Sequence, residues 1–235
     1  MDPRRPEPRV AVLTAADEVA RDTFVYRLQL DQPLPFVAGQ FVNLAVPDAK
    51  PRGERSYSVW SGPGDPSALE LCIKLFEGGA ASEYLRGSRV GDILHLRGPF
   101  GIFAAKPDHD PLIFVATATG LAPFRSMLEV ALTTKDPRKF RVYFGVRCEE
   151  DLFGLEDLER YKRGLPDFQY QVCLSRPSPA WTGFTGRVTH ALAADFPTPT
   201  EHFYLCGNGA MIEETRDLLK GRGLERKHIH VEKYY

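Results

Sequence analysis

The fold of this chain is decided by the stretch Leu112-Ile113-Phe114-Val115-Ala116-Thr117-Ala118-Thr119-Gly120-Leu121-Ala122-Pro123. It begins with a continuous apolar run (112–116), which is typical of a strand buried on both faces. Pro123 favours the first turn of a helix, which we expect to run to about Leu132. Small residues lie between strand and helix, in the kind of turn whose free N–H groups bind phosphate. The stretch therefore predicts one strand–turn–helix unit of a nucleotide-binding domain.

The rest of the C-terminal half repeats this alternation of strand and helix. We predict further strands at 141–146, 168–174, 202–206 and 229–232, and further helices at 155–163, 188–194 and 211–220. Strands that alternate with helices form a parallel sheet, and ligands of such sheets bind at the carboxyl ends of the strands. Those ends are the loops at Thr117, Arg147, Ser175 and Cys206. The half has no G-x-G-x-x-G, so that dinucleotide fingerprint gives no support.

The N-terminal half has a different sequence pattern, with short segments of alternating apolar and polar residues separated by turns. Strands are expected at 10–13, 23–30, 40–44, 55–60, 69–76 and 93–97. Short strands with turn signals between them predict an antiparallel β-barrel. Residues 107–111 are typical of a linker, so we place the domains at 1–106 and 107–235. The expected fold is a two-domain chain, an antiparallel β-barrel followed by an α/β domain with a parallel sheet.

Composition and charge argue against several classes of function. The 235 residues carry a formal net charge of −1, so no overall positive field favours nucleic acid or an acidic membrane. No apolar run reaches the ~20 residues of a membrane helix, and residues 1–8 do not resemble a signal peptide. The four cysteines (Cys72, Cys148, Cys173 and Cys206) are too widely spaced to predict a zinc site or an iron–sulfur cluster. Such thiols fit a reducing cytoplasm, where we expect the protein.

The stretch Arg55-Ser56-Tyr57-Ser58 is the candidate site of the barrel half. On a strand, Arg55 and Tyr57 share a face, which pairs a planar cation with an aromatic ring. A guanidinium holds a pyrophosphate through paired hydrogen bonds, and a tyrosine ring offers a stacking surface. The pair suits a ligand with a diphosphate and a large flat ring, which describes FAD. The alternative is an ordinary edge strand with one solvated arginine and one packed tyrosine.

A second small-residue loop, Glu77-Gly78-Gly79-Ala80-Ala81-Ser82, lies in the same half. Its glycines and alanines have small side chains that leave the backbone N–H groups accessible. Ser82 is the expected N-cap of a short helix. Free N–H groups at the start of that helix would take the second side of the pyrophosphate. The alternative is a flexible loop and a capped helix that bind nothing.

Arginines follow two strands of the α/β half. Ser175-Arg176 comes after the third predicted strand, Arg147 after the second, and Arg187 lies eleven residues beyond Arg176. An acidic residue in such a loop would bind the ribose of NAD, whereas converging arginines favour the 2′-phosphate of NADP(H). The alternative is three solvated surface arginines.

These motifs, in this order, resemble those of the ferredoxin–NADP(+) reductase family over nearly the whole chain. Residues 55–58 resemble its R-x-Y-S flavin motif, residues 78–82 its second diphosphate loop, and residues 117–123 its G-x-G-T-G-I-A-P turn. Thr117 and Ala118 stand where that turn has glycines. The segments Cys206-Gly207-Asn208-Gly209 and Glu232-Lys233-Tyr234-Tyr235 are similar to the motif that approaches the nicotinamide and to the C-terminus of bacterial members.

The resemblance implies a role for each matching residue. Arg55 would bind the FAD diphosphate, Tyr57 would pack on the isoalloxazine, and Ser58 would hydrogen-bond near flavin N5. Because Ser58 is out of phase with the other two, the flavin must cross the end of the strand. The predicted catalytic residues are Ser58, Cys206, Glu232, Tyr234 and Tyr235. The predicted cofactor-binding residues are Arg55, Ser56, Tyr57, Ser58, Ile73, Lys74, Gly79, Ala81, Ser82, Thr119, Arg147, Ser175, Arg176, Arg187, Tyr234 and Tyr235.

Within these sets some assignments stay open. Either Tyr234 or Tyr235 would cover the flavin, while the other stacks on the adenine of FAD. Glu232 would share in proton traffic with Ser58, or else it is a solvated acid near the terminus.

We therefore predict a FAD-dependent oxidoreductase, a ferredoxin/flavodoxin–NADP(+) reductase. It would transfer hydride between NADPH and flavin N5, and single electrons to or from ferredoxin or flavodoxin. Because the chain has no cluster-binding cysteines, the electron carrier is expected to be a separate protein. One alternative is an NAD(P)H-dependent flavoprotein reductase of an oxygenase system. Another is a non-enzymatic module that binds a nucleotide, which the departure at Thr117 and Ala118 keeps open.

Overall fold

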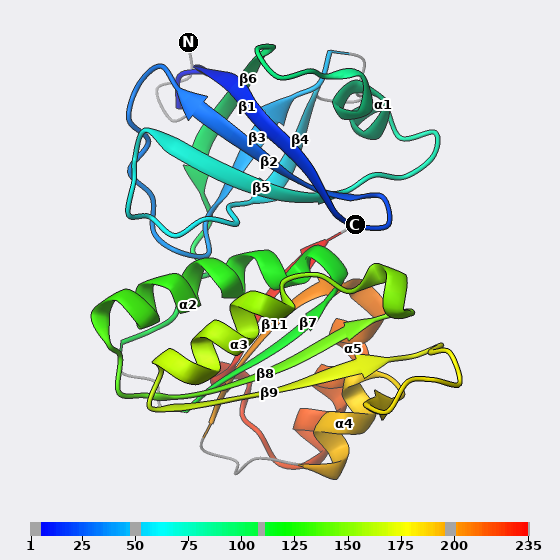
Figure 1. Ribbon diagram of the computed structural model, residues 1–235. Helices are drawn as coiled ribbons and strands as arrows, with labels where there is room; N and C mark the ends of the chain where they lie inside the picture. Colours follow the sequence, from blue (N-terminus) through cyan, green and yellow to red (C-terminus); the bar gives the residue numbers. More distant parts are fainter. Residues whose placement is uncertain (1–5, 48–52, 108–110, 196–200, 235) are drawn as a thin grey trace. The chain divides into compact units, whose positions relative to one another are not determined.

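The structure is a computed structural model that describes residues 6–47, 53–107, 111–195 and 201–234 (Figure 1). The chain divides into two units. Unit 1 comprises residues 1–104 and 125–130, and unit 2 comprises residues 105–124 and 131–235. Tyr235 and residues 108–110 of the expected linker lie outside the described residues.

Unit 1 is built on a six-stranded antiparallel sheet in the order β4-β3-β6-β1-β2-β5. Its strands are β1 (Arg9–Ala20), β2 (Thr23–Leu30), β3 (Phe41–Ala45), β4 (Glu54–Ser58), β5 (Ala68–Lys74) and β6 (Ile93–Phe100). An antiparallel bridge between Val59 and Leu71 connects the segment after β4 with β5, so the two edges of the sheet meet. The expected antiparallel, barrel-like domain is confirmed.

The core of unit 1 comes from alternate strand residues that point to the inside of the barrel. On β3, Val42 and Leu44 are fully buried while the residues between and beside them are partly exposed. Helix α1 (Ala80–Gly87) adds Leu85 to the same core. Each such side chain contributes about 1.5–3 kcal/mol relative to an exposed one, which holds β3 and its neighbour β4 in a fixed register.

Unit 2 is a six-stranded parallel sheet in the order β10-β9-β8-β7-β11-β12. Its strands are β7 (Leu112–Thr117), β8 (Lys139–Val146), β9 (Asp167–Leu174), β10 (Phe184–Thr185), β11 (His202–Asn208) and β12 (Ile229–Tyr234). The helices are α3 (Leu155–Gly164), α4 (Val188–Ala194) and α5 (Gly209–Gly221), with short 3-10 turns η1 (Ala118–Leu121), η2 (Glu149–Asp151) and η3 (Arg226–His228). Helix α2 (Ala122–Thr134) follows η1, and its two ends belong to unit 2 while residues 125–130 are counted with unit 1. The strand order reverses between β7 and β11, the position where open α/β sheets bind ligands.

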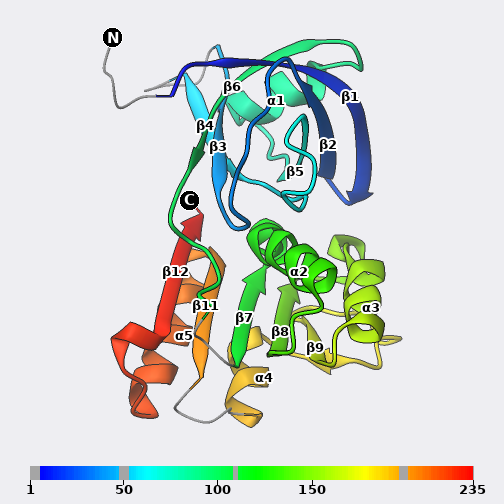
Figure 2. The same ribbon diagram turned by 90° about the vertical axis from the view of Figure 1, so that its left-hand side faces the viewer.

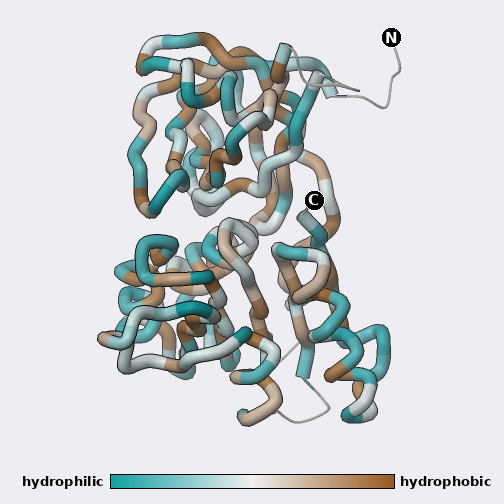
Figure 3. Tube along the Cα trace, turned by 90° about the vertical axis from the view of Figure 1, so that its right-hand side faces the viewer, coloured by the Kyte–Doolittle hydropathy of each residue, from teal (hydrophilic) through white to brown (hydrophobic). Residues whose placement is uncertain are grey.

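Both faces of this sheet are covered, as the apolar run at 112–116 predicted. Ile113 and Val115 of β7 pack in a core that includes residues of α4 and α5. Phe114, on the other face, stacks on Phe124 of α2 with ring centroids 4.7 Å apart. Figure 2 shows the helices on the two sides of the strands. Along the trace in Figure 3, apolar stretches (brown) are interspersed with hydrophilic ones (teal) in both units.

Two local expectations were wrong or incomplete. Helix α1 begins at Ala80 with Gly79 as its N-cap residue, so Ser82 lies inside the first turn and does not cap the helix. The two-residue strand β10, which pairs with Cys173 and Leu174, was not predicted. Among the described residues, no helix combines the length and apolar character needed to cross a membrane.

Candidate functional site

On β4, Arg55 and Tyr57 lie on one face, as the strand alternation predicted. They stand opposite Leu44 and Val42 of β3, whose side chains are buried in the core. Tyr57 is half-buried and packs against that core. Burial raises the pKa of Tyr57 to about 12, and the charge of the nearby Arg55 lowers it in part. The phenol therefore stays neutral at physiological pH beside a guanidinium.

The serines of β4 lie on the opposite face. Ser56 donates its hydroxyl hydrogen to Oδ1 of Asn43 at 2.7 Å, which fixes β4 to β3. Ser58, the last residue of the strand, is buried and stands opposite Phe41. The structure thus keeps Ser58 out of phase with Arg55 and Tyr57, so a single ring can meet all three only across the end of β4.

The loop before α1 is open and small-residue rich. Gly78 has φ +73°, and an added Cβ there would meet no atom within 4 Å. Ser82 is buried, and its Oγ accepts a hydrogen bond from the backbone N–H of Phe76 at 2.8 Å. The serine thus ties the loop to the end of β5. The first N–H groups of α1, including that of Ala81, have no partner within the helix, as at any helix start.

Two further residues of the predicted FAD set lie at the end of β5. The side chain of Ile73 is buried in the core of unit 1. Lys74 donates from Nζ to the carbonyl of Arg21 at 3.0 Å. Ile73 therefore offers a ligand only its backbone.

In unit 2, the turn after β7 packs directly on the end of β11. A Cβ on Gly120 would lie 2.3 Å from the carbonyl oxygen of Cys206, so only glycine permits this approach. Gly207 has φ +126°, and a Cβ there would lie 2.4 Å from Oγ1 of Thr117. The two turns at the switch point are therefore in backbone contact, and Thr119 lies half-buried between Thr117 and Gly120.

Thr117 and Ala118, the departures from the family turn, are accommodated in two ways. Oγ1 of Thr117 accepts a hydrogen bond from the backbone N–H of Asn208 at 3.0 Å. Ala118 adopts φ +48°, in the left-handed region that favours glycine. The turn thus keeps its shape through a side-chain hydrogen bond and one strained residue.

The capping role of Asn208 was not predicted from the sequence, although the residue belongs to the motif at 206–209. Its Oδ1 accepts a hydrogen bond from the backbone N–H of Ala210 at 2.8 Å, which makes it the N-cap of α5. The signal was present, because asparagine is a preferred N-cap residue, but the helix was expected to begin at Met211.

Three predicted catalytic residues meet at the carboxyl ends of β11 and β12. The parallel register places Cys206 beside Glu232 and Asn208 beside Tyr234. Cys206 is fully buried, and burial followed by the charge of Glu232 raises the pKa of its thiol well above the usual value. Hydrogen bonds with the Tyr234 side chain and the Gly207 backbone lower that pKa in part. Cys206 is therefore a neutral thiol and a poor nucleophile.

The predicted arginine cluster is assembled in part. The backbone N–H of Arg176 donates to the carbonyl of Arg147 at 2.7 Å, so the ends of β8 and β9 bring these two exposed residues together, with Ser175 beside them. Arg187 precedes α4, and its guanidinium forms an ion pair of 2.6 Å with Glu214 of α5. A phosphate bound by Arg187 must compete with that carboxylate.

Comparison with known proteins assigns a domain type to each part of the chain. Residues 10–104 match the oxidoreductase FAD-binding domain, and residues 114–217 match the oxidoreductase NAD-binding domain. The chain is 38% identical over 208 residues to ferredoxin–NADP reductase B of Sorangium cellulosum, with 85% of each chain covered. It is 36% identical to the phenol hydroxylase P5 protein of Acinetobacter pittii, of whose length it spans 60%. A solved cytochrome P450 reductase of Amycolatopsis superposes with a TM-score of 0.87 at 31% identity, over 97% of this chain and 69% of that one.

Proposed function

Since the chain belongs to the ferredoxin–NADP(+) reductase family, we propose that it carries electrons between NADPH and a ferredoxin or flavodoxin, with FAD as its cofactor. Its matched domain types make it an oxidoreductase that binds FAD and NAD(P)H. The observation that carries the proposal is the grouping of Cys206, Glu232 and Tyr234 at the carboxyl ends of β11 and β12, beside the turn at Gly120. We expect the protein in the cytoplasm.

The chemistry of the residues in unit 1 fits FAD. Arg55 supplies a fork of donors for a diphosphate, and Tyr57 supplies an apolar ring close to it. The loop at Gly78 and Gly79 leaves its backbone bare, with the N–H groups at the start of α1 as a second anion site. When bound, FAD would supply the hydride and single-electron chemistry.

The chain's own residues would position the reactants. Tyr57 would pack against the flavin ring, and Ser58, at the end of β4, would place its hydroxyl near flavin N5. The buried thiol of Cys206 would contact the nicotinamide and orient it, while Glu232 would accept or return a proton on the same edge. An aromatic residue at the C-terminus, Tyr234 or Tyr235, would have to move aside for the nicotinamide, so motion of the terminus would gate the reaction.

Anaerobic spectroscopy tests the proposal most directly. The purified chain should be yellow, and NADPH should bleach the flavin absorbance within a single turnover. Reoxidation by added ferredoxin should then restore the colour. A colourless protein, or a yellow one that neither NADPH nor NADH bleaches, would overturn the proposal and favour a nucleotide-binding module without activity.

The preference for NADPH rests on Arg176 and its neighbour Arg147. Replacing Arg176 with Ala removes a charge-assisted contact to the 2′-phosphate worth about 1.5–3 kcal/mol. We expect a loss of roughly 10- to 150-fold in kcat/KM for NADPH and little change for NADH. Arg163→Ala on α3 removes an equal charge elsewhere in unit 2 and serves as the control. Equal losses with both nucleotides would contradict the assignment.

A second candidate is the reductase of an oxygenase system, which the likeness to the phenol hydroxylase P5 protein favours. It predicts comparable activity with NADH, and electron delivery to an oxygenase-associated carrier in preference to a free ferredoxin. Rates with both nucleotides and both carriers, measured side by side, separate the two candidates.

A further inference from the structure

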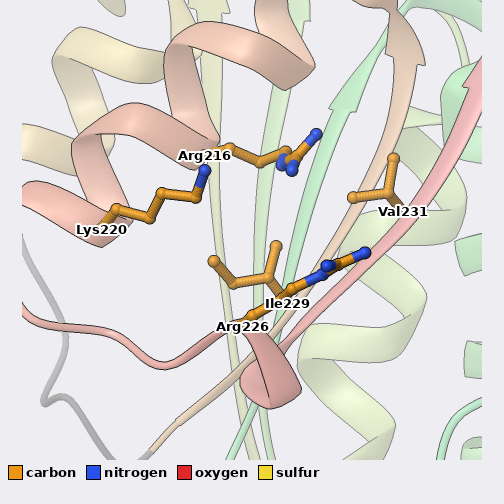
Figure 4. A pocket seen from close by; sticks show the side chains of 5 residues that line it. All are labelled: Arg216, Lys220, Arg226, Ile229 and Val231. Carbon is orange, nitrogen blue, oxygen red and sulfur yellow. The ribbon is translucent and has the colours of Figure 1, made fainter.

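Unit 2 has a hollow on its surface between α5 and the edge strand β12 (Figure 4). Its volume is about 180 Å³. The lining side chains are Arg216 and Lys220 of α5, Arg226 of η3, and Ile229 and Val231 of β12. Three cations from two helical elements thus surround a floor of two aliphatic side chains.

The cations of this hollow differ from other cations of the same elements in their ion pairing. Within the described part of the chain, Arg216, Lys220 and Arg226 form no ion pair. Other cations of the same elements do find carboxylates: Lys227 pairs with Glu225 at 3.1 Å and Lys233 pairs with Glu213 at 3.6 Å. Like charges gathered on a partly apolar surface repel one another, and an anion between them would relieve that repulsion.

The side chains define the chemistry of the anion. Figure 4 shows Arg216 and Arg226 extending past opposite sides of Ile229, with the amino group of Lys220 directed toward Arg216. Guanidinium forks match the oxygens of a phosphate in pairs, and a lysine adds a point charge. Three positive charges favour a dianion over a monoanion. The hollow is smaller than the ~300–1,000 Å³ of sites for larger ligands, so it accepts one small group.

The hollow is separate from the predicted nucleotide site. Ile229 and Val231 pair with Phe203 and Leu205. Because side chains alternate along a strand, they lie on the opposite face of β12 from Glu232 of the predicted nucleotide site. We propose that this hollow binds a phosphate dianion, supplied by inorganic phosphate or by a small organic phosphate. The competing explanation is that the cations only discourage other strands from pairing with the edge of β12.

Titration of the FAD-loaded chain with inorganic phosphate and with phenyl phosphate at low ionic strength tests the proposal. Backbone amide shifts in the NMR spectrum should move saturably at residues 216–231 and give a Kd below about 1 mM. Arg216→Gln, Lys220→Gln and Arg226→Gln should each weaken binding roughly tenfold. Arg163→Gln, which removes a charge from α3, should leave the Kd unchanged.

The same titration identifies the source of the phosphate. Tighter binding of phenyl phosphate than of inorganic phosphate indicates an organic phosphate whose apolar part contacts Ile229 and Val231, whereas equal affinities indicate free phosphate. Shifts confined to residues 175–187, or shifts at 216–231 that do not saturate, would overturn the proposal. Because the shifts are mapped on the unaltered protein, they locate the bound phosphate even if a variant folds poorly.

Discussion

The loop before α1 and the turn before α2 are both small-residue segments that open a helix, yet their glycines have different physical roles. Gly78 has φ +73°, and a Cβ there would meet no atom within 4 Å, so glycine is favoured at this position by the backbone conformation alone. Gly120 needs no unusual φ, but a Cβ there would lie 2.3 Å from the carbonyl oxygen of Cys206. In unit 1 the glycine permits a left-handed backbone conformation. In unit 2 the glycine permits the backbone of β11 to approach the turn closely.

The hydroxyl groups of the two segments differ in how far away in the sequence their hydrogen-bond partners lie. Ser82 accepts from Phe76, six residues away, so the first loop is held by a local contact. Thr117 accepts from Asn208, which is 91 residues away in the sequence. A change in the first loop should therefore stay local, whereas a change in the second should reach the strand that carries Cys206. Four substitutions test this contrast.

The largest effect is expected from Gly120→Ala. The added methyl group meets a backbone carbonyl that cannot rotate away, so either β11 or the turn must shift. Overpacking of this kind costs typically 1–3 kcal/mol and sometimes more, and we expect the upper end, about 3 kcal/mol, in the free energy of unfolding measured with urea. The KM for NADPH should also rise, because Cys206 moves with the strand.

The matched control for this substitution is Gly221→Ala at the end of α5. No atom lies within 4 Å of the Cβ position there, and the residue is helical. Alanine is preferred to glycine in helices by up to about 1 kcal/mol, so this variant should be as stable as the parent or slightly more so. If the two variants unfold alike, the close approach of the two turns is wrong.

Thr117→Val should have the next largest effect. Valine keeps the shape of threonine but cannot accept the hydrogen bond from Asn208, which is left with an unpaired N–H. We expect a loss of about 1–2 kcal/mol in unfolding free energy. The KM for NADPH should rise with little change in kcat. Thr117→Ser retains the hydroxyl and should restore most of both quantities; identical behaviour of Val and Ser would show that the hydrogen bond is unimportant.

The fold was predictable largely because its strands and helices carry their own signals. Thr23–Leu30 and Val188–Ala194 were predicted to the residue. In β2 alternation marks the buried face. The apolar run at 112–116 likewise predicted a strand buried on both faces, and the packing of Ile113 and Phe114 confirms this prediction.

The parts that were missed depend on contacts that no local pattern contains. The strand at Phe184–Thr185 is two residues long, so it has no periodicity to detect. A hydroxyl near a helix start suggests a cap, but whether Ser82 caps α1 or holds Phe76 depends on the path of the chain out of β5. The pairing of Arg187 with Glu214 joins two helices, and only the folded sheet brings them together.

Ser82→Ala tests the local half of the comparison. Loss of the acceptor for the Phe76 N–H should cost about 1 kcal/mol of unfolding free energy. The dissociation constant for FAD should rise severalfold, while the KM for NADPH at saturating FAD should stay the same. Ser88→Ala, at the other end of α1, removes a hydrogen bond to the carbonyl of Tyr84 and is the control. A change in the NADPH constant would mean that the loop acts beyond unit 1.

The smallest effect is expected from Ala118→Gly, which gives the unit 2 turn a glycine of the conformational kind found at Gly78. The left-handed conformation costs alanine roughly 1–2 kcal/mol. Glycine removes that cost but adds about 0.5–1 kcal/mol of conformational entropy in the unfolded chain. The two contributions nearly cancel, so the unfolding free energy should change by no more than about 1 kcal/mol. A smaller KM for NADPH would then show that the Ala118 methyl group holds the pyrophosphate away from the turn, whereas a clear loss of stability would show that this methyl group packs in a way that offsets its strain.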